Sequence, residues 1–336
     1  MNRKLVLIFS DWHVHIFSQF NSDGHRLPTC LKVLKDIGKF CKKHGITTIL
    51  FAGDLYDKQK ALPTEVVNEV IEAFKIFFFN HSDIEIIAIS GNHDQASINT
   101  IHKPAVTALK HLSSVFDNFK LIDNNSYNVT DDVTVWGIPY YEYEEDFKER
   151  LTEVSKKAIH NSENRNYLLI HQTPKGLGND MIQTDTSPKD SEYAAFDYTF
   201  CGHIHIHKQI TKNFMLVGNP NQKDASDEGQ VKGFVVMNLN APENGYKHIE
   251  LKGYPKFITV EQGTEVDAGI DYIIEKPKEV SQSISIEATE ESFDASESPV
   301  DLVTSYCEEV APEDKELLSI GLSFLPANLI KDLTNE

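Results

Sequence analysis

Three histidines alternate near the middle of the chain, in the stretch "CGHIHIH" at 201–207. Alternate side chains of an extended strand point to the same side, so His203, His205 and His207 can share one face. Imidazole nitrogens bind transition metals and carry protons, whereas a hydrophobic core has little use for three of them. A polar strand face would also explain this stretch alone, so the other polar clusters of the chain must decide.

Five apolar runs that resemble buried strands are followed directly by side chains able to bind a metal. In α/β proteins, the carboxyl ends of the strands form the edge where loops converge and sites assemble. We therefore expect these side chains to meet. They are Asp11 and His13 after 4–10, Asp54 after 46–52, Asn92 and His93 after 84–90, His171 after 167–170, and His203 and His205 after 198–201.

The candidate ligands form a mixed oxygen and nitrogen set without a thiolate, which suits manganese, iron or zinc better than calcium. Seven ligands exceed the needs of one ion. If Asp54 bridges two ions, each receives four protein ligands and keeps open positions, as in two-metal sites that displace a phosphoryl group. The seven residues are Asp11, His13, Asp54, Asn92, His171, His203 and His205.

Each motif alone also has a structural explanation. The stretch "SDWHVH" (10–15) fits a turn with surface histidines, and "GDLYD" (53–57) fits a tight turn in which Asp54 caps the backbone. Likewise "GNHD" (91–94) fits a turn, and His171 fits a strand end. The joint occurrence of all of them beyond strand ends favours the metal site.

The pattern of apolar residues predicts an α/β protein. The strand-like runs 4–10, 46–52 and 84–90 alternate with amphipathic segments at 28–44 and 64–79, whereas short strands dominate the later sequence. This order predicts two stacked mixed β-sheets flanked by helices. A helix stop is expected at Gly45, and a helical face of Val67, Val70, Ile71 and Phe74.

The motif order Asp-x-His, Gly-Asp-x-x-Asp, Gly-Asn-His-Asp, His, Gly-His-x-His resembles the calcineurin-like metallophosphoesterases over residues 5 to about 240. This resemblance implies their four-layer sandwich. The motifs "GDLYD" and "GNHD" resemble the SbcD-type DNA-repair nucleases, because phosphoprotein phosphatases carry Asp-Arg-Gly in the second motif and Glu in place of Asp94. The segment 217–239, the chain length and the weakly patterned C-terminus resemble the phage members of that branch, the small subunits of recombination endonucleases.

The resemblance also implies a role for each site residue. One ion would be held by Asp11, His13, Asp54 and His205, and the other by Asp54, Asn92, His171 and His203. His93 would lie beside the ions and either protonate the leaving oxygen or hold the scissile phosphate. Asp57 would orient His93 and stabilise its charge. His15 and His207 extend two motifs, and we expect neither to be a metal ligand.

By the same resemblance, the chain would be an exonuclease and endonuclease with two divalent ions. Mn²⁺ is expected first, and Mg²⁺, Fe²⁺ or Zn²⁺ stay open. The expected partners are double-stranded DNA ends and single-stranded regions, a second copy of the chain, and an SbcC-type ATPase. The predicted domains are a nuclease core at 1–255, a small α+β DNA-capping region with an acidic linker at 256–300, and C-terminal helices at 301–336 that bind the ATPase.

Two positions depart from the family pattern. The family usually has a Gly shortly after the His of the first motif, where this chain reads "DWHVHIF", and Gly218-Asn219-Pro220 replaces a Gly-Ser-Pro turn. Two other functions stay open. They are a metallophosphoesterase for small phosphodiesters or phosphoproteins, and an inactive scaffold that binds DNA or the ATPase.

The chain of 336 residues has a formal net charge of −19, which alone argues against a nucleic-acid partner. Eleven Asp and Glu against one Lys lie between 281 and 316, so over half of the excess belongs to one stretch. The four cysteines lack CxxC spacing, and no signal peptide or membrane-spanning run is evident. We therefore expect a cytoplasmic protein without a membrane partner, located in the host cytoplasm if a phage encodes it.

Overall fold

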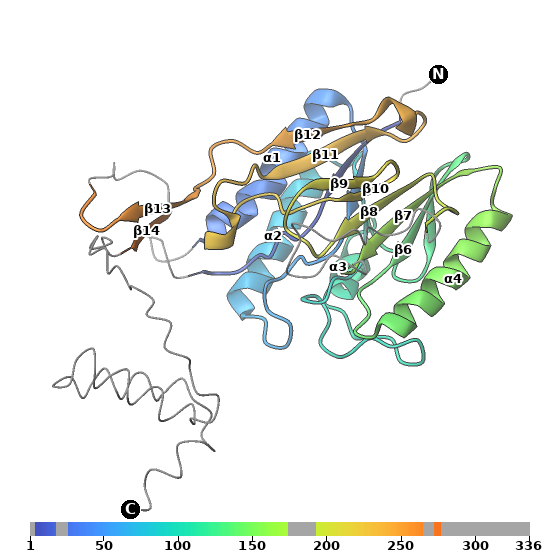
Figure 1. Cartoon of the computed structure of the whole chain (residues 1–336), viewed down its shortest axis with the longest axis horizontal. Helices are drawn as coiled ribbons and strands as arrows, with labels where there is room; N and C mark the ends of the chain where they lie inside the picture. Colours follow the sequence, from blue (N-terminus) through green and yellow to red (C-terminus); the bar gives the residue numbers. More distant parts are fainter. Residues whose placement is uncertain (1–3, 18–25, 174–192, 265–271, 277–336) are drawn as a thin grey trace, which may run out of the picture. The chain divides into compact units, whose positions relative to one another are not determined.

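A computed structural model describes residues 4–17, 26–173, 193–264 and 272–276 (Figure 1). The chain divides into two compact units, Met1–Lys278 and Glu279–Glu336, and all described residues belong to the first. The acidic stretch and the expected C-terminal helices lie outside the described residues.

The first sheet has six strands in the order β12-β11-β1-β2-β3-β4, of which β1 to β4 are parallel and β11 and β12 antiparallel. Helices α1 and α2 cover its outer face, together with the short helix α3. The bounds are β1 Leu5–Phe9, β2 Thr48–Phe51, β3 Glu85–Ala88, β4 Phe119–Leu121, β11 Gly233–Asn238, β12 Tyr246–Glu250, α1 Leu27–His44, α2 Thr64–Asn80 and α3 Leu109–Val115.

The second sheet has the order β5-β6-β7-β8-β10-β9, with parallel strands in the middle and an antiparallel strand at each edge. Helix α4 packs on its outer face through Phe147, Leu151 and Val154. The bounds are β5 Ser126–Thr130, β6 Val133–Ile138, β7 Arg165–His171, β8 Tyr198–Gly202, β10 Phe214–Leu216, β9 Lys208–Thr211 and α4 Glu144–His160.

The two sheets pack face to face over one apolar layer. Val6 and Ile8 of β1 and Leu50 of β2 meet side chains of the second sheet there, such as Leu169 and Phe200. The alternate residues of the same strands, such as Leu7 and Phe9, point outward to α1 and α2. The result is a helix–sheet–sheet–helix arrangement (Figure 1), which confirms the predicted fold class.

Prediction from the sequence missed or misplaced several elements. The buried face of α2 comprises Val66, Val70, Phe74 and Phe77, so the predicted face was rotated, and Val67 and Ile71 are only half-buried. Helix α4 was not expected, because its charged residues outnumber its apolar ones. The stop at Gly45 is confirmed, with a left-handed φ of 66°. Among the described helices, none is long and apolar enough to cross a membrane.

The predicted region after 256 begins with two short strands, β13 Phe257–Glu261 and β14 Tyr272–Lys276, which pair in parallel. The loop before β11 holds them to the core: Gln222 Oε1 accepts a hydrogen bond from Phe257 N at 2.6 Å, and the Glu228 carboxylate accepts from Thr259 N and Oγ1 at 2.6 Å each. This small sheet belongs to the first unit, and the domain boundary expected at 255/256 stays a prediction.

Candidate metal centre

Five strand ends deliver the candidate ligands to one edge of the stacked sheets. Strands β1, β2 and β3 are parallel and in register at their last residues, where Phe9 pairs with Phe51 and Phe51 with Ala88. In the second sheet, His171 at the end of β7 pairs with Gly202 at the end of β8. Within each sheet, the loops after these strands therefore begin at the same level.

Four of the predicted ligand residues have a left-handed backbone, which costs non-glycine residues on the order of 1–2 kcal/mol each. The φ angles are 54° at Asp11, 49° at His13, 59° at Asp54 and 81° at His203. Hydrogen bonds between the first two loops hold this geometry, from Asp11 N to Gly53 O at 2.9 Å and from His13 N to Asp54 O at 3.0 Å. Such outliers cluster at functional sites because the surrounding fold must enforce them.

Two motif glycines permit the close approach of the loops. A Cβ on Gly91 would lie 2.1 Å from Asp54 Oδ1, and one on Gly202 would lie 2.3 Å from both Ala52 O and Ser10 Oγ. No side chain fits at these distances. The glycine of "GNHD" is thus needed for two neighbouring loops of the first sheet to approach, and that of "CGHIH" for the second sheet to approach the first.

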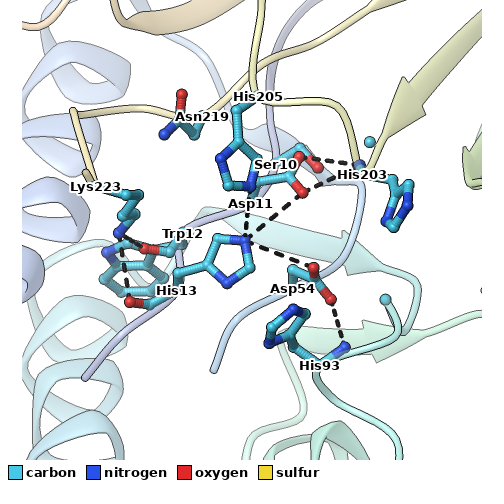
Figure 2. Close-up of polar contacts among 12 residues, drawn as sticks. Ser10, Asp11, Trp12, His13, Asp54, His93, His203, His205, Asn219 and Lys223 are labelled. Atoms are coloured by element: carbon cyan, nitrogen blue, oxygen red, sulfur yellow. Dashed lines mark hydrogen bonds and ion pairs between the residues drawn. The ribbon is translucent and has the colours of Figure 1, made fainter. Parts of the chain in front are cut away.

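The first group of ligand atoms comes from Asp11, His13 and His205 (Figure 2). His13 Nε2 lies 3.0 Å from His205 Nε2, 3.9 Å from Asp11 Oδ1 and 3.6 Å from Asp54 Oδ2. Two ligand atoms that are each about 2.1 Å from one ion are about 3 to 3.5 Å apart. These separations are close to that range, so the group could hold one divalent ion.

The second group comes from Asp54, His171 and His203, with Asn92 beside it. His171 Nε2 lies 3.3 Å from Asp54 Oδ2 and 3.1 Å from Asn92 Oδ1, and His203 Nδ1 lies 2.9 Å from Asn92 Oδ1. His171 Nδ1 donates to Ala52 O at 2.7 Å, which leaves Nε2 free to bind a metal. Asp54 Oδ2 is close to both groups, the position that a bridging carboxylate requires.

His93 lies beside the first group and forms a cluster with His13 and Asp57. Its backbone N donates to Asp54 Oδ1 at 2.8 Å. The sequence predicted that the Asp57 carboxylate orients this imidazole, but the contact of His93 Nδ1 is with the Asp57 backbone oxygen. The carboxylate instead lies 3.9 Å from His13 Nδ1 and 3.4 Å from Lys58 Nζ.

Charge in the buried site is unevenly balanced. Burial raises the pKa of Asp11. For Asp54, burial is outweighed by His171, so its pKa falls below the usual range. For His171, burial is outweighed by Asp54 and Asp11, so its pKa rises to about 9. Burial lowers the pKa of His13, and lowers that of His203 to about 3. Carboxylates beside the neutral imidazoles of His13 and His203 favour a divalent cation, whereas His171 has to release a proton before it can bind one.

Asp94 fixes the loops that carry Asp54 and Asn92. Its carboxylate accepts hydrogen bonds from four backbone N–H groups, at 2.8 Å from Asp54, 2.9 Å from Leu55, 3.2 Å from Tyr56 and 3.0 Å from Gly91. Burial and the neighbouring Asp54 raise the pKa of Asp94 to about 7, although the N–H donors oppose that shift. Sequence reasoning used Asp94 only to separate two branches of the family.

Two buried lysines, which sequence reasoning also missed, bind the backbone of the metal-site loops. Lys223 Nζ donates to the carbonyls of Trp12 and His13 (Figure 2). Lys232 Nζ donates to His205 O at 2.9 Å and pairs with Asp227 at 2.5 Å. Both lie in the segment 217–239 that resembled the nuclease branch, but a single lysine in a loop gives no sequence signal of burial.

A cavity of about 670 Å³ opens over the site and is lined by four of the predicted ligands and by His93. The ligands are Asp54, His13, His203 and His205. His15 also lines it, whereas His207 stacks on His248 away from the ligand groups. A substrate therefore has access to the space between the candidate ligands and His93.

Comparison with known proteins gives a family and one curated relative. The family model described as calcineurin-like phosphoesterase matches residues 4–207. Exonuclease subunit 1 of Enterobacteria phage T4 is 24% identical over 237 residues, which are 68% of this chain and 63% of that protein. The chain thus spans slightly less than two thirds of the relative's length.

Solved structures with similar folds are more distant in sequence. The protein TT1561 of Thermus thermophilus is 12% identical, with a TM-score of 0.46 over 74% of this chain and 99% of that one. A dimetal phosphatase from Danio rerio is 10% identical, with a TM-score of 0.47 over 70% of this chain and 92% of that one.

Proposed function

Because the chain belongs to the calcineurin-like phosphoesterase family and is thus a metal-dependent hydrolase of phosphoester bonds, we propose that it is a two-metal DNA nuclease. It acts as exonuclease and endonuclease, as the nuclease subunit of an SbcCD-like complex. The observation that carries this proposal is the position of Asp54 Oδ2, 3.6 Å from His13 Nε2 and 3.3 Å from His171 Nε2. The choice of DNA is supported by the phage relative, which is called an exonuclease subunit.

In the proposed mechanism, Asp54 is shared by two ion sites. Asp11, His13 and His205 complete one, and Asn92, His171 and His203 complete the other. Bound divalent ions, with Mn²⁺ proposed first, supply positive charge to the phosphoryl group and activate water. Asp11 also accepts hydrogen bonds from His203 N at 3.0 and 3.1 Å, which joins the loop of the last motif to that of the first.

His93 is proposed to protonate the leaving oxygen. The Asp57 carbonyl accepts a hydrogen bond from Nδ1–H of His93, which fixes the orientation of the ring. Nε2–H is then available as the acid for the leaving group. The role predicted for the Asp57 side chain thus passes to its backbone oxygen, while the carboxylate adds negative charge near His13 and Lys58.

The partners are part of the proposal. The name of the phage relative contains the word subunit, which supports assembly with another protein, here an SbcC-type ATPase. A homodimer through α2 and α3 is supported by their exposed apolar side chains, since Phe79 is 88% exposed and Ile76 and Val115 are about half exposed.

The test is manganese-dependent release of nucleotides from linear duplex DNA, run beside a chromogenic phosphodiester. Asp54→Ala is compared with Asp131→Ala, which removes an exposed carboxylate between β5 and β6. The nuclease is supported if the wild type and Asp131→Ala cleave both substrates and Asp54→Ala cleaves neither. Hydrolysis of the small ester alone, unchanged by the ATPase partner, would favour an enzyme for small phosphodiesters or phosphoproteins.

A further inference from the structure

The cavity over the metal centre extends beyond the residues that the proposed reaction uses. Its volume of about 670 Å³ lies within the range of about 300–1,000 Å³ typical of sites that enclose a whole small molecule. One side is formed by Phe17, Arg26, Lys58, Lys223 and Phe257, which we call the aromatic–cationic wall. None of these residues belongs to a ligand group of the metal centre.

Arg26 organises the wall. Its guanidinium carbon lies 4.7 Å from the ring centroid of Phe17, 5.4 Å from that of Phe257 and 4.4 Å from that of Tyr272. Its Nη2 donates to the carbonyls of Gln222 and Lys223. Among the described residues no carboxylate forms an ion pair with this buried guanidinium, so its positive charge contributes to the cavity.

Phe17 presents an aromatic ring at the rim. It is half-exposed and has a φ of 48°, a strained conformation for a phenylalanine. Arg26 and Lys223 both lie over the ring, with Lys223 Nζ 5.7 Å from its centroid. His15 holds the residue further through an edge contact at 5.2 Å and a hydrogen bond from Phe17 N to His15 Nδ1 at 3.2 Å. A strained, partly exposed aromatic held next to a reaction centre is typical of a ligand clamp.

Cationic groups outnumber the carboxylates in this part of the cavity. The cations that line it are Arg26, Lys58 and Lys223, and the carboxylates are Asp57 and Asp224. The Lys58 side chain is 58% exposed. The aromatic ring and the positive charge together match a nucleotide, which offers a flat base for stacking and a phosphate for the cations. A small alkyl ester or a phosphoserine would leave the aromatic side without a partner.

We propose that the aromatic–cationic wall is a subsite for the nucleoside that adjoins the scissile phosphate, with its base stacked on Phe17 and its next phosphate near Lys58. The inference rests on the proposed nuclease function and deepens it. The metal centre performs the hydrolysis, and the wall selects a nucleic-acid strand. Because every base has a stacking face, the subsite is sequence-tolerant.

The first test compares esters that share p-nitrophenol as leaving group. They are the 5′- and 3′-p-nitrophenyl phosphates of thymidine and methyl p-nitrophenyl phosphate, all with manganese. The wild type should show a higher kcat/KM for one thymidine ester than for the methyl ester. Phe17→Leu keeps apolar bulk against Arg26 and should lower only that thymidine value, by about tenfold, the effect of losing one base–aromatic stack.

Two control variants make the comparison specific. Phe17→Tyr retains the ring and should retain the preference for the thymidine ester. Phe79→Leu alters an exposed phenylalanine of α2 and should change none of the rates. A wild type that hydrolyses all three esters equally well, or a Phe17→Leu variant that keeps the thymidine preference, would overturn the subsite and leave the phosphodiesterase activity standing.

The second test measures stacking without turnover. A dinucleotide that contains 2-aminopurine is titrated with protein in the presence of a chelator, and the fluorescence of the base is followed because stacking quenches it. The wild type should quench it and Phe17→Leu should not. Equal quenching by both proteins, or none by either, would reject the subsite. If the esters are not hydrolysed but quenching depends on Phe17, the proposed catalytic function fails and the nucleotide site remains.

Discussion

At the scale of single residues, Asp54 joins the two halves of the site. Its Oδ2 faces both groups of ligand atoms, while its Oδ1 accepts the backbone N–H of His93. The same side chain therefore sets the spacing of the proposed ions and the position of the proposed acid. Replacing a metal ligand by alanine should weaken metal binding, whereas replacing the proton donor should lower the rate of hydrolysis.

His93→Ala should lower kcat for a small phosphodiester by about 10²–10⁴-fold, the usual contribution of a general acid, and leave two bound manganese ions per chain. His205→Ala should weaken binding of one ion by at least about tenfold, because it removes a direct ligand. Calorimetric titration with Mn²⁺, run beside initial rates, separates the two effects. Unimpaired hydrolysis in His93→Ala would refute the acid role.

Asp94 should stabilise the fold, and its replacement should also disturb the loops that carry the candidate metal ligands. Asp94→Asn replaces one acceptor oxygen with an N–H₂ group that faces two of the four backbone donors. We expect the free energy of unfolding to fall by about 1–3 kcal/mol, the cost of buried donors without acceptors. Urea denaturation in a chelator measures this without a contribution from metal binding, and Asp131→Asn is the exposed control. An unchanged midpoint would show that the four hydrogen bonds are not needed.

The positions of the candidate ligands could be predicted from sequence because polar residues interrupt strongly apolar runs there. Asp11 after 4–10 and His171 after 167–170 are visible as breaks in such runs. Lys223 and Lys232 could not be predicted, since their burial depends on carbonyls that lie 211 and 27 residues away in the sequence. The orientation of His93 was missed because a contact with a backbone oxygen leaves no trace in residue type.

At the scale of elements, prediction succeeded for central strands and failed at edges and on helix faces. Strand β6 occupies the predicted residues 133–138. It lies between two strands, and both of its faces are buried. Helix α2 carries apolar residues around much of its circumference, so several faces fit the sequence and packing against the sheet selects one.

Strand β12 gives the fold a dependence on pH through a pair of stacked imidazoles. His248 stacks on His207 with ring centroids 4.2 Å apart and planes at 6°. Burial, and to a lesser extent His207 and Lys232, lower the pKa of His248 to about 4, whereas Glu250 acts in the opposite direction. The unfolded value is 6.5, so the folded state favours neutral His248. This stability is complete above about pH 6.5 and is lost as the pH falls towards about 4.

We therefore expect His248→Phe, which can stack but cannot titrate, to lose less stability than the wild type between about pH 7 and about pH 5. The difference should be about 1 kcal/mol, because the side chain is partly exposed and solvent screens its charge. Urea unfolding at the two pH values measures it. His111→Phe, at an exposed position on α3, should behave as the wild type does, and an equal loss in all three proteins would contradict the assignment to His248.

At the scale of the whole molecule, the charge of the chain opposes its proposed substrate. The formal charge is −19, and the stretch 281–316 carries eleven of the acidic residues against one lysine. DNA is a dense polyanion, so a strongly acidic protein is repelled over roughly one Debye length, about 10 Å at 0.1 M salt. Bound divalent ions offset this charge only at the metal centre.

Replacing the eleven acidic residues of 281–316 by Asn and Gln should tighten binding of linear duplex DNA by about tenfold at low salt. The advantage should shrink as salt is raised, because added ions screen the repulsion between the acidic stretch and DNA. Fluorescence anisotropy of labelled DNA in a chelator, measured across a salt series, gives both quantities without cleavage. A control in which the nine Ser and Thr residues of the same stretch are changed to Asn should bind as the wild type does. Equal affinities of the neutralised and wild-type proteins at every salt concentration would show that the acidic stretch does not repel DNA.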